Sequence, residues 1–450
     1  MSTNYQKSLY DRTNVWYYIN ILCKALVREE QKLDQVIFHV DVNSAFLSWE
    51  AVDRLRNRNE TLDIRTIPAI IGGSQEKRHG IVLAKSVLCK PFGIQTGEPI
   101  VSALEKCPNL QIFSPTYGIY VQYSKALMKL LESYAPVIEQ YSIDEAFCDM
   151  TGTQRMYGPP LEFAEKLRME IEERLGFTVN IGVAPNKLLA KMASDFQKPN
   201  RVHSLTYEEM PLKMWPLDVS ELFFVGKNTA LKLHNLGIHT IGELARTSPM
   251  LLEHHFKKQG HVIWNYANGN DTSMVTNHSV ANKGYGNSTT IAYDVTTSGM
   301  ALQVLLSLCE TVCARLRADN ARITVVAISI KDTDLQTVSR QCTLFSPTNV
   351  TMEIFDSVSK LFASLWDGRP IRALGVSTSK VAANDSYQYN LFDMEKYEKQ
   401  GKVDHAVDLV RERFGNDAIK RACFIKPNQP HVTIDSQNDR PPGRTNKDQF

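Results

Sequence analysis

Three carboxylates have residue types and positions that could support phosphoryl transfer. Asp41 lies near the end of IFHVDV (Ile37 to Val42), a segment apolar enough for a buried strand, and Asp144 and Glu145 lie between two short strand-like segments. Burying a carboxylate is costly unless its charge is neutralised, and Mg²⁺ prefers oxygen ligands. Two such ions about 3.5–4 Å apart can clamp the attacking and leaving oxygens of an in-line displacement. By spacing alone, Asp144 and Glu145 could equally be turn residues and Asp41 a capping residue.

The elements around these carboxylates predict that the three side chains converge. Six segments follow the order β–α–β–β–α–β, and they are marked by Ile37, Gly118, Val137, Glu145, Leu161 and Thr178. This is the split-βαβ order of ferredoxin-like sheets, in which the first strand neighbours the hairpin. The carboxylates would then meet on one face of the sheet. The order alone is weak evidence for function, because this fold hosts many unrelated functions.

Composition sets broad limits on the class of protein. The 450 residues are enough for about three domains, and 43% apolar and 22% charged residues are typical of globular chains. Lys and Arg total 51 against 49 Asp and Glu, so a phosphate-binding surface would need local clustering of charge. The eight cysteines are scattered and show no zinc spacing, and such scattering in a long chain suggests a reducing compartment. Cys309 and Cys313, the closest pair, are expected to face a core.

The sequence predicts a cytoplasmic protein with no membrane contact. The longest apolar run, Trp16 to Val27, is interrupted by Asn20 and Lys24 and is too short to span a bilayer. Asp11 and the lack of a small-residue cleavage site argue against a signal peptide.

A resemblance to a known family rests on five motifs in a fixed order. They are FHVDVNSAF, GIVLAKS, YSIDEAF, GVAPNKLLAKMASDFQKPN and FFVGKNTALKLHNLGIHTIGEL. In this order they resemble the Y-family DNA polymerases, in particular the bacterial DinB/UmuC group of lesion-bypass enzymes. The similarity covers about residues 36–425, which is most of the chain.

The resemblance implies an α+β multidomain fold with named parts. We expect an N-terminal extension (1–35), a ferredoxin-like catalytic palm (36–44 and 114–200), small inserted fingers (45–113), a helical thumb with helix-hairpin-helix units (201–270), a linker (271–285), a separate α+β little finger (286–383), and a tail (384–450) with a disordered end.

At the active centre the resemblance implies a two-metal site. The ligands of two Mg²⁺ ions would be the side chains of Asp41, Asp144 and Glu145 and the backbone carbonyl of Val42. Asn43 stands where the family often has a second Asp. Phe46 takes the place of an aromatic steric gate that excludes the ribose 2′-OH. By residue type alone, Phe46 would be a core aromatic on a helix face.

Lysines would bind the incoming nucleotide. The resemblance gives Lys187 the role of neutralising the triphosphate, and Lys191 could assist it. Many relatives carry a Tyr-x-x-Arg pair in the fingers, where this chain has Val87 and Lys90. Lys90 can neutralise a phosphate as a point charge but lacks the bidentate fork of Arg, and Lys85 is a second candidate.

Two regions resemble DNA-binding parts of the family. Gly226, Lys227 and Gly237 lie in a helix-hairpin-helix-like array, where backbone N–H groups at a helix start can bind a phosphate without reading sequence. A glycine between helices is often only a C-cap, but the adjacent Lys227 favours phosphate binding. In the little finger, the candidates for DNA contacts are Arg315, Arg317, Arg322, Arg340 and Arg372, each of which could equally be a solvated surface charge.

The tail carries a short peptide that resembles a clamp-binding motif. Gln388, Leu391 and Phe392 in QYNLF match the Q-x-x-L-F peptide by which bacterial polymerases bind the sliding clamp. Ordering such a tail limits its affinity. Without its position after the last folded domain, the peptide would be an anchor packed on the protein itself.

Together these features predict a monomeric, template-directed DNA polymerase that extends a primer on primer–template DNA with dNTPs. The resemblance implies low-fidelity translesion synthesis in DNA damage tolerance and repair. A non-catalytic DNA-binding or clamp-associated protein on the same fold is an alternative, supported only by Val87 and Lys90. A nucleotidyl cyclase on a similar palm would keep the paired acids but would need neither the helix-hairpin-helix array nor the clamp-like peptide.

Overall fold

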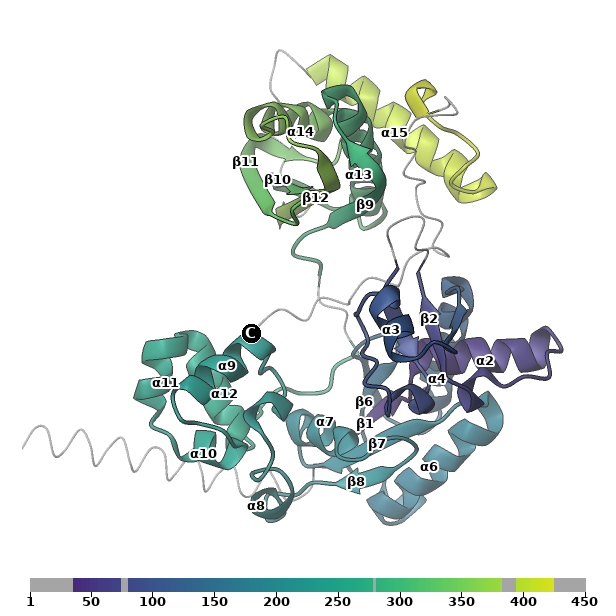
Figure 1. The fold of residues 1–450 in the computed structure, drawn as a ribbon, viewed down its shortest axis with the longest axis vertical. Helices are drawn as coiled ribbons and strands as arrows, with labels where there is room; N and C mark the ends of the chain where they lie inside the picture. The colour runs from purple at the N-terminus through teal and green to yellow at the C-terminus, as the bar shows by residue number, and fades with distance from the viewer. Residues whose placement is uncertain (1–34, 74–79, 278–280, 383–393, 425–450) are drawn as a thin grey trace, which may run out of the picture. The chain divides into compact units, whose positions relative to one another are not determined.

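The computed structural model describes residues 35–73, 80–277, 281–382 and 394–424 (Figure 1). Its contacts define two compact units, Met1–Val52 with Gln122–His278 and Asp53–Val121 with Ser279–Phe450. The predicted N-terminal extension up to residue 34, the clamp-like peptide and the predicted disordered end lie outside the described residues.

The first unit is built on a five-stranded sheet with the order β5-β6-β1-β7-β8. The strands are β1 (Ile37–Val42), β5 (Val137–Gln140), β6 (Glu145–Asp149), β7 (Val179–Ala184) and β8 (Val202–Ser204). The first four pair antiparallel, and with α4 (Tyr117–Glu132) and α6 (Pro160–Leu175) they form the ferredoxin-like order that the sequence predicts. The short β8 adds in parallel beside β7.

Side chains of β1 alternate between the two faces of this sheet. Phe38 faces α6, with its ring 6.4 Å from that of Phe163. On the other face, Nδ1 of His39 lies 2.8 Å from Oγ of Ser194 in α7 (Lys187–Asp195). Helix α7 lies directly on the backbone of β7 because residue 182 is glycine: a Cβ there would be 1.9 Å from a carbonyl oxygen of the helix. The face of β1 that carries Asp41 is therefore covered closely by α7.

Short helices follow the palm and share a core with α7. They are α8 (Met210–Lys213), α9 (Lys227–Asn235), α10 (Ile241–Arg246), α11 (Pro249–Phe256) and α12 (Lys258–Ala267). Leu189, Leu233 and Leu252 are fully buried in this common core.

The first part of the predicted linker is anchored to the same unit. A carboxylate oxygen of Asp271 accepts a hydrogen bond from the backbone N–H of Leu188 in the first turn of α7, at 3.1 Å. Val275 is buried in the common core, and the N–H of Thr276 donates to Glu139 at 3.3 Å. The stretch 271–276 is thus part of the folded unit, although its polar composition is typical of a linker.

Residues 45–113, the predicted fingers, contain a small three-stranded sheet with its own core. The elements are α2 (Ala45–Asn57), β2 (Ala69–Gly72), β3 (Val82–Lys85), α3 (Ile100–Lys106) and β4 (Gln111–Phe113), in the sheet order β3-β2-β4. Ile70, Ile94 and Ile100 are buried in that core. The first turns of α2 instead belong to the first unit, where Trp49 is fully buried and meets Phe177 edge-on.

A four-stranded sheet in the predicted little finger has the order β11-β10-β12-β9 and is covered on one face by two helices (Figure 1). Its elements are β9 (Gly286–Val295), α13 (Ser298–Ala318), β10 (Arg322–Asp332), β11 (Thr337–Thr348), α14 (Thr351–Leu365) and β12 (Ile371–Ala382). By length and composition, α13 could cross a membrane, but 67% of its most apolar window is buried within the structure, as expected for the central helix of a folded domain.

Helix α15 (Met394–Phe414) is attached to this domain by buried ion pairs. The guanidinium of Arg317 contacts Asp404 at 3.3 Å and Asp408 at 2.5 Å, and Glu310 binds Arg411 at 3.1 Å. Arg317, one of five arginines that the sequence suggested for DNA contacts, is therefore engaged in holding α15. The sequence did not indicate this role because the two aspartates lie 87 and 91 residues further along the chain.

Replacement of Arg317 should weaken this domain. Arg317→Met leaves Asp404 buried without its closest cation, and we expect a loss of about 3 kcal/mol in the free energy of unfolding. Arg315→Met on the exposed side of α13 is the matched control and should cost no more than about 0.5 kcal/mol. Chemical denaturation measures both changes, and equal losses in the two variants would contradict this role of Arg317.

Candidate active site

Two adjacent strands bring the three carboxylates together. Asp41 in β1 and Glu145 at the start of β6 are direct register partners, and Asp144 precedes Glu145. The N–H of Val42 donates to the carbonyl oxygen of Asp144 at 3.0 Å, which fixes the backbone between the two strands. The structure thus brings all three predicted acidic residues to one end of the sheet.

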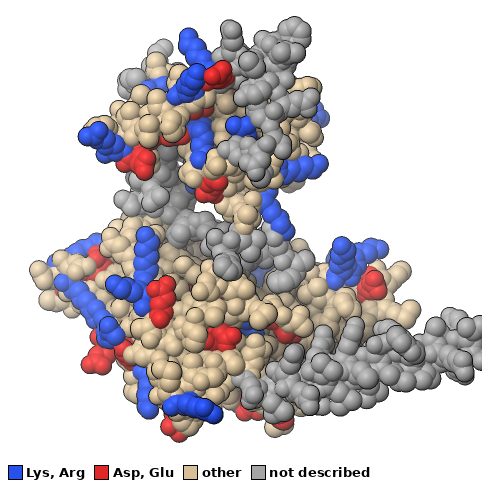
Figure 2. Space-filling model, turned by 180° about the vertical axis from the view of Figure 1, so that it is seen from behind, with Lys and Arg blue, Asp and Glu red and all other residues tan. Residues whose placement is uncertain are grey.

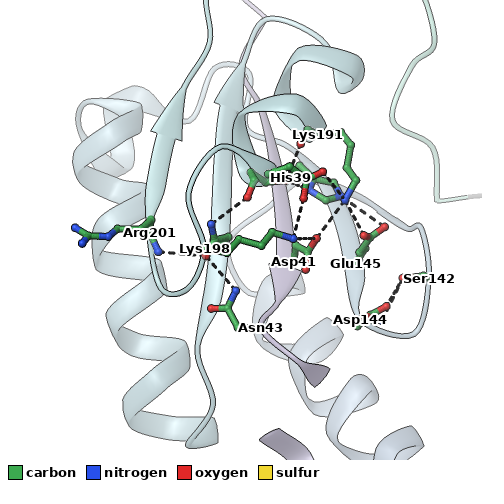
Figure 3. Close-up of polar contacts among 12 residues, drawn as sticks. His39, Asp41, Asn43, Ser142, Asp144, Glu145, Lys191, Lys198 and Arg201 are labelled. Carbon is green, nitrogen blue, oxygen red and sulfur yellow. Dashed lines mark hydrogen bonds and ion pairs between the residues drawn. The ribbon is translucent and has the colours of Figure 1, made fainter. Parts of the chain in front are cut away.

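Two lysines contact these carboxylates (Figure 3). Nζ of Lys191 lies 2.7 Å from Oε1 of Glu145 and 3.2 Å from Oδ2 of Asp41. Nζ of Lys198 lies 2.8 Å from the same Asp41 oxygen. Both ammonium groups also contact Asp195, at 3.3 and 2.8 Å. Asp144 has a different partner, because the hydroxyl of Ser142 donates to its Oδ1 at 2.6 Å.

Burial and neighbouring charges shift the pKa values of the acids in opposite directions. Burial opposes ionisation of Asp41, but the charges of Lys191 and Lys198 outweigh it and lower the pKa of Asp41 to about 2. For Glu145, burial is the largest effect, and together with the charge of Asp41 it outweighs Lys191 and raises the pKa to about 7. Burial and the charge of Asp41 also raise the pKa of Asp144.

The donor chemistry of this cluster fits a hard divalent cation. The charge of Asp41 raises the pKa values of Asp144 and Glu145, and Asp144 also raises that of Glu145. A dication would relieve this repulsion. As the side chains stand, the described ranges contain no group of three His, Cys, Asp or Glu residues gathered closely enough to hold a metal ion. Lys191 bridges Asp41 and Glu145, so metal binding requires its ammonium to move aside.

The sequence predictions for the nucleotide lysines agree only in part with this geometry. Lys187 lies away from the carboxylates, with its Nζ 2.7 Å from Glu139 and 5.0 Å from the centre of the Phe147 ring. Lys191, which the sequence suggested as a second lysine for the triphosphate, bridges Asp41 and Glu145. Lys198 was missed by the sequence reasoning, although it lies in the KPN motif and could have been found from it.

Phe46 and the two finger lysines occupy separate surroundings. Phe46 is the second residue of α2 and is half-buried, with its ring 6.1 Å from that of Trp49. The ammonium of Lys85 donates to the carbonyl oxygen of Ile94. Lys90 is exposed at the end of a short 3₁₀ turn (Val87–Cys89), and the Val87 side chain is exposed as well.

The predicted DNA-binding residues of the thumb lie at helix ends. Gly226 is the N-cap of α9 and Lys227 its first residue, and both are exposed. Gly237 has φ of +77°, a left-handed conformation that favours glycine, between α9 and α10. These positions are compatible with a backbone approach to a phosphate.

In the little finger, the sheet face opposite α13 and α14 carries small and hydroxyl side chains. Register places Gln341, Ala327 and Ser377 in one row across the strands, and Ser339, Ser329 and Gly375 in the next. Arg322 begins β10, and Arg315 lies exposed on α13 with its guanidinium 3.4 Å from the carbonyl oxygen of Gly286. The sequence reasoning missed this hydroxyl-rich face because its residues are far apart in the chain. In the view of Figure 2, Lys and Arg side chains (blue) and Asp and Glu side chains (red) are interspersed over the surface.

Comparison with known proteins identifies the family. The impB/mucB/samB family model matches residues 40–195, and the model of that family's C-terminal domain matches residues 282–391. The chain is 41% identical to DNA polymerase IV of Clostridium acetobutylicum over 88% of this chain and 99% of that protein. It is 36% identical to DNA polymerase IV 2 of Bacillus subtilis over 87% and 95%, respectively.

A solved structure supports the fold. A Y-family DNA polymerase chimera of Dbh and Dpo4 matches with a TM-score of 0.66 and 23% identity, over 78% of this chain and all of that chain. The family models and the relatives show that the chain belongs to the impB/mucB/samB family and is a DNA-directed DNA polymerase.

Proposed function

We propose that this polymerase adds deoxynucleotides to a primer 3′ end by a two-metal mechanism and is specialised for low-fidelity lesion bypass in DNA damage tolerance and repair. The observation that carries the mechanism is the convergence of Asp41, Asp144 and Glu145 at the adjoining ends of β1 and β6. The specialisation rests on the family and on the small size of the segment 45–113.

The ligands of the two Mg²⁺ ions would be the three carboxylates and the carbonyl oxygen of Val42. Bound there, Mg²⁺ supplies Lewis-acid stabilisation for the attacking and leaving oxygens of the displacement. The protein contributes the fixed backbone between β1 and β6, which holds Asp41 and Glu145 as register partners. It also contributes partial burial of the acids, which strengthens their interaction with a cation.

Lys198 is the best placed lysine for the triphosphate. Its ammonium contacts a carboxylate oxygen of Asp41 at 2.8 Å, and 31% of its side-chain surface is exposed. It can therefore reach a phosphate bound beside the carboxylates. Further nucleotide contacts would come from Lys187, Lys85 and Lys90. Phe46 would pack against the sugar and exclude a 2′-OH.

Primer–template DNA would be held by the thumb and the little finger. Gly226, Lys227 and Gly237 offer backbone N–H groups and a positive charge to a phosphate. In the little finger, Arg315, Arg322 and the hydroxyl-rich sheet face can bind the DNA backbone, because serine and threonine hydroxyls and exposed N–H groups are common phosphate donors.

The remaining partners follow from the sequence and the family. We propose that Gln388, Leu391 and Phe392 bind a sliding clamp and that the enzyme acts as a cytoplasmic monomer.

Removal of one acid should abolish primer extension. Asp144→Ala should lower the rate on an undamaged template with Mg²⁺ and dNTPs by at least about a thousandfold, because it removes charge that binds the metals. Asp149→Asn, at the other end of β6, is the matched control and should extend primers normally. Near-normal extension by Asp144→Ala would contradict the proposed site.

The raised pKa of Glu145 should appear in the stability of the metal-free protein. Because the folded state holds a proton on Glu145 up to about pH 7 while an unfolded glutamate loses it near pH 4.5, this group's contribution to stability is present at low pH and is lost as the pH rises from about 4.5 to 7. Glu145→Gln should remove this decline in thermal unfolding scans, and Mg²⁺ should reduce it in the wild type. Identical pH profiles for the two proteins would contradict the shift.

Truncation of the proposed steric gate should relax sugar selection. Phe46→Ala removes the ring that would clash with a 2′-OH, and we expect incorporation of ribonucleotides relative to deoxynucleotides to rise by about 10- to 200-fold. Single-nucleotide insertion assays measure the ratio of kcat/KM values for the two substrates. A ratio that does not change would indicate that Phe46 is only a packing residue.

A further inference from the structure

A loop that carries Lys198 is held to the sheet by two buried asparagines. The side chain of Asn180 in β7 is fully buried, and Asn43, just after β1, is 8% exposed. The Nδ2 group of Asn43 donates to Oδ1 of Asn180 at 3.1 Å. In turn, Oδ1 of Asn43 accepts the backbone N–H of Asn200 at 2.8 Å. Figure 3 shows Asn43 beside the loop that bears Lys198 and Arg201.

Asn180 contacts the same loop and the last turn of α7. Its Nδ2 group donates to the carbonyl oxygen of Gln197 at 2.6 Å and to that of Ser194 at 3.0 Å. Its Oδ1 also accepts the N–H of Arg201 at 3.3 Å. Side-chain amides therefore bind the backbone on both sides of Lys198, at Gln197 before it and at Asn200 and Arg201 after it.

The chemistry of these contacts requires neutral amides at both positions. Each side chain donates with its nitrogen and accepts with its oxygen, and a carboxylate can only accept. An aspartate at position 43 would place an oxygen against Oδ1 of Asn180. A reversed Asn180 amide would relieve that contact but would then face the carbonyl groups of Gln197 and Ser194 with its oxygen. The family often has a second Asp at position 43. Here the amide of Asn43 can donate to the Asn180 oxygen, which an aspartate could not do.

We propose that Asn43 and Asn180 are positioning residues that hold loop 197–201 so that the ammonium of Lys198 lies at Asp41, where it meets the incoming triphosphate. The inference rests on the proposed role of Lys198 in nucleotide binding. It assigns no contact with substrate to either asparagine. Their effect on catalysis passes entirely through the place of Lys198.

A double-mutant cycle tests the proposal. The variants are Asn180→Ser, whose hydroxyl is too short to reach both Asn43 and the loop, Lys198→Ala, and the two combined. Asn180→Ser should raise the KM for dNTP by about three- to tenfold, as expected for the loss of one or two hydrogen bonds. The double variant should have the KM of Lys198→Ala alone, because the loop then has no ammonium to position.

Hydrogen exchange supplies a readout that does not depend on activity. The N–H groups of Asn200 and Arg201 should lose protection in Asn180→Ser, because their acceptors are the two asparagine side chains. Val183→Ala on the same strand is the matched control; it weakens the core of β7 without touching the loop and should leave both the KM and these amides unchanged relative to the wild type.

Additive effects of the two substitutions on KM, or unchanged exchange at Asn200 and Arg201 in Asn180→Ser, would overturn the proposal. A different failure is also distinguishable. If Lys198→Ala leaves the KM for dNTP unchanged while Asn180→Ser still exposes the two amides, then the asparagines hold the loop, and it is the proposed nucleotide role of Lys198 that is wrong.

Discussion

The need to neutralise a buried cluster of acids governs the structure around the active centre. Asp41, Asp144 and Glu145 lie at adjoining register positions in a partly buried site, where like charges repel strongly. Lys191 and Lys198 offset part of that repulsion. The uneven result, with a pKa of about 2 for Asp41 and about 7 for Glu145, shows that the balance is incomplete. An incompletely neutralised acidic site is one that divalent cations can bind.

The placement of both lysines depends on contacts made by uncharged groups. Gly182 allows α7 to lie against β7, and this approach brings Lys191 over the carboxylates. The loop that follows α7 is tied back by Asn43 and Asn180, which brings Lys198 to Asp41 from the other side. A side chain at residue 182 would displace the helix and the start of the loop together, so strand, helix and loop form one support for the site.

The sequence was sufficient to predict the strands that carry the acids. The apolar run Ile37–Val42 and the hairpin Val137–Asp149 have patterns set by local burial, and their order indicates which strands are neighbours. Other contacts were not predictable, because they depend on tertiary structure. The buried face of α15 carries Asp404 and Arg411, whereas Val403 is 54% exposed, so its hydrophobic pattern points to the wrong face. Asp271 lies in a stretch whose polar composition is typical of a linker, yet its carboxylate binds the first turn of α7.

The most direct test of the proposed site is to locate the metal ions. Crystals of the enzyme with primer–template DNA, an incoming nucleotide and Mn²⁺ in place of Mg²⁺ would show the ions by anomalous scattering. The two-metal site requires two peaks within coordination distance of Asp41, Asp144 and Glu145, with Lys191 moved away from the bridge between Asp41 and Glu145. A bound nucleotide with no metal at these carboxylates, and Lys191 still bridging them, would contradict it.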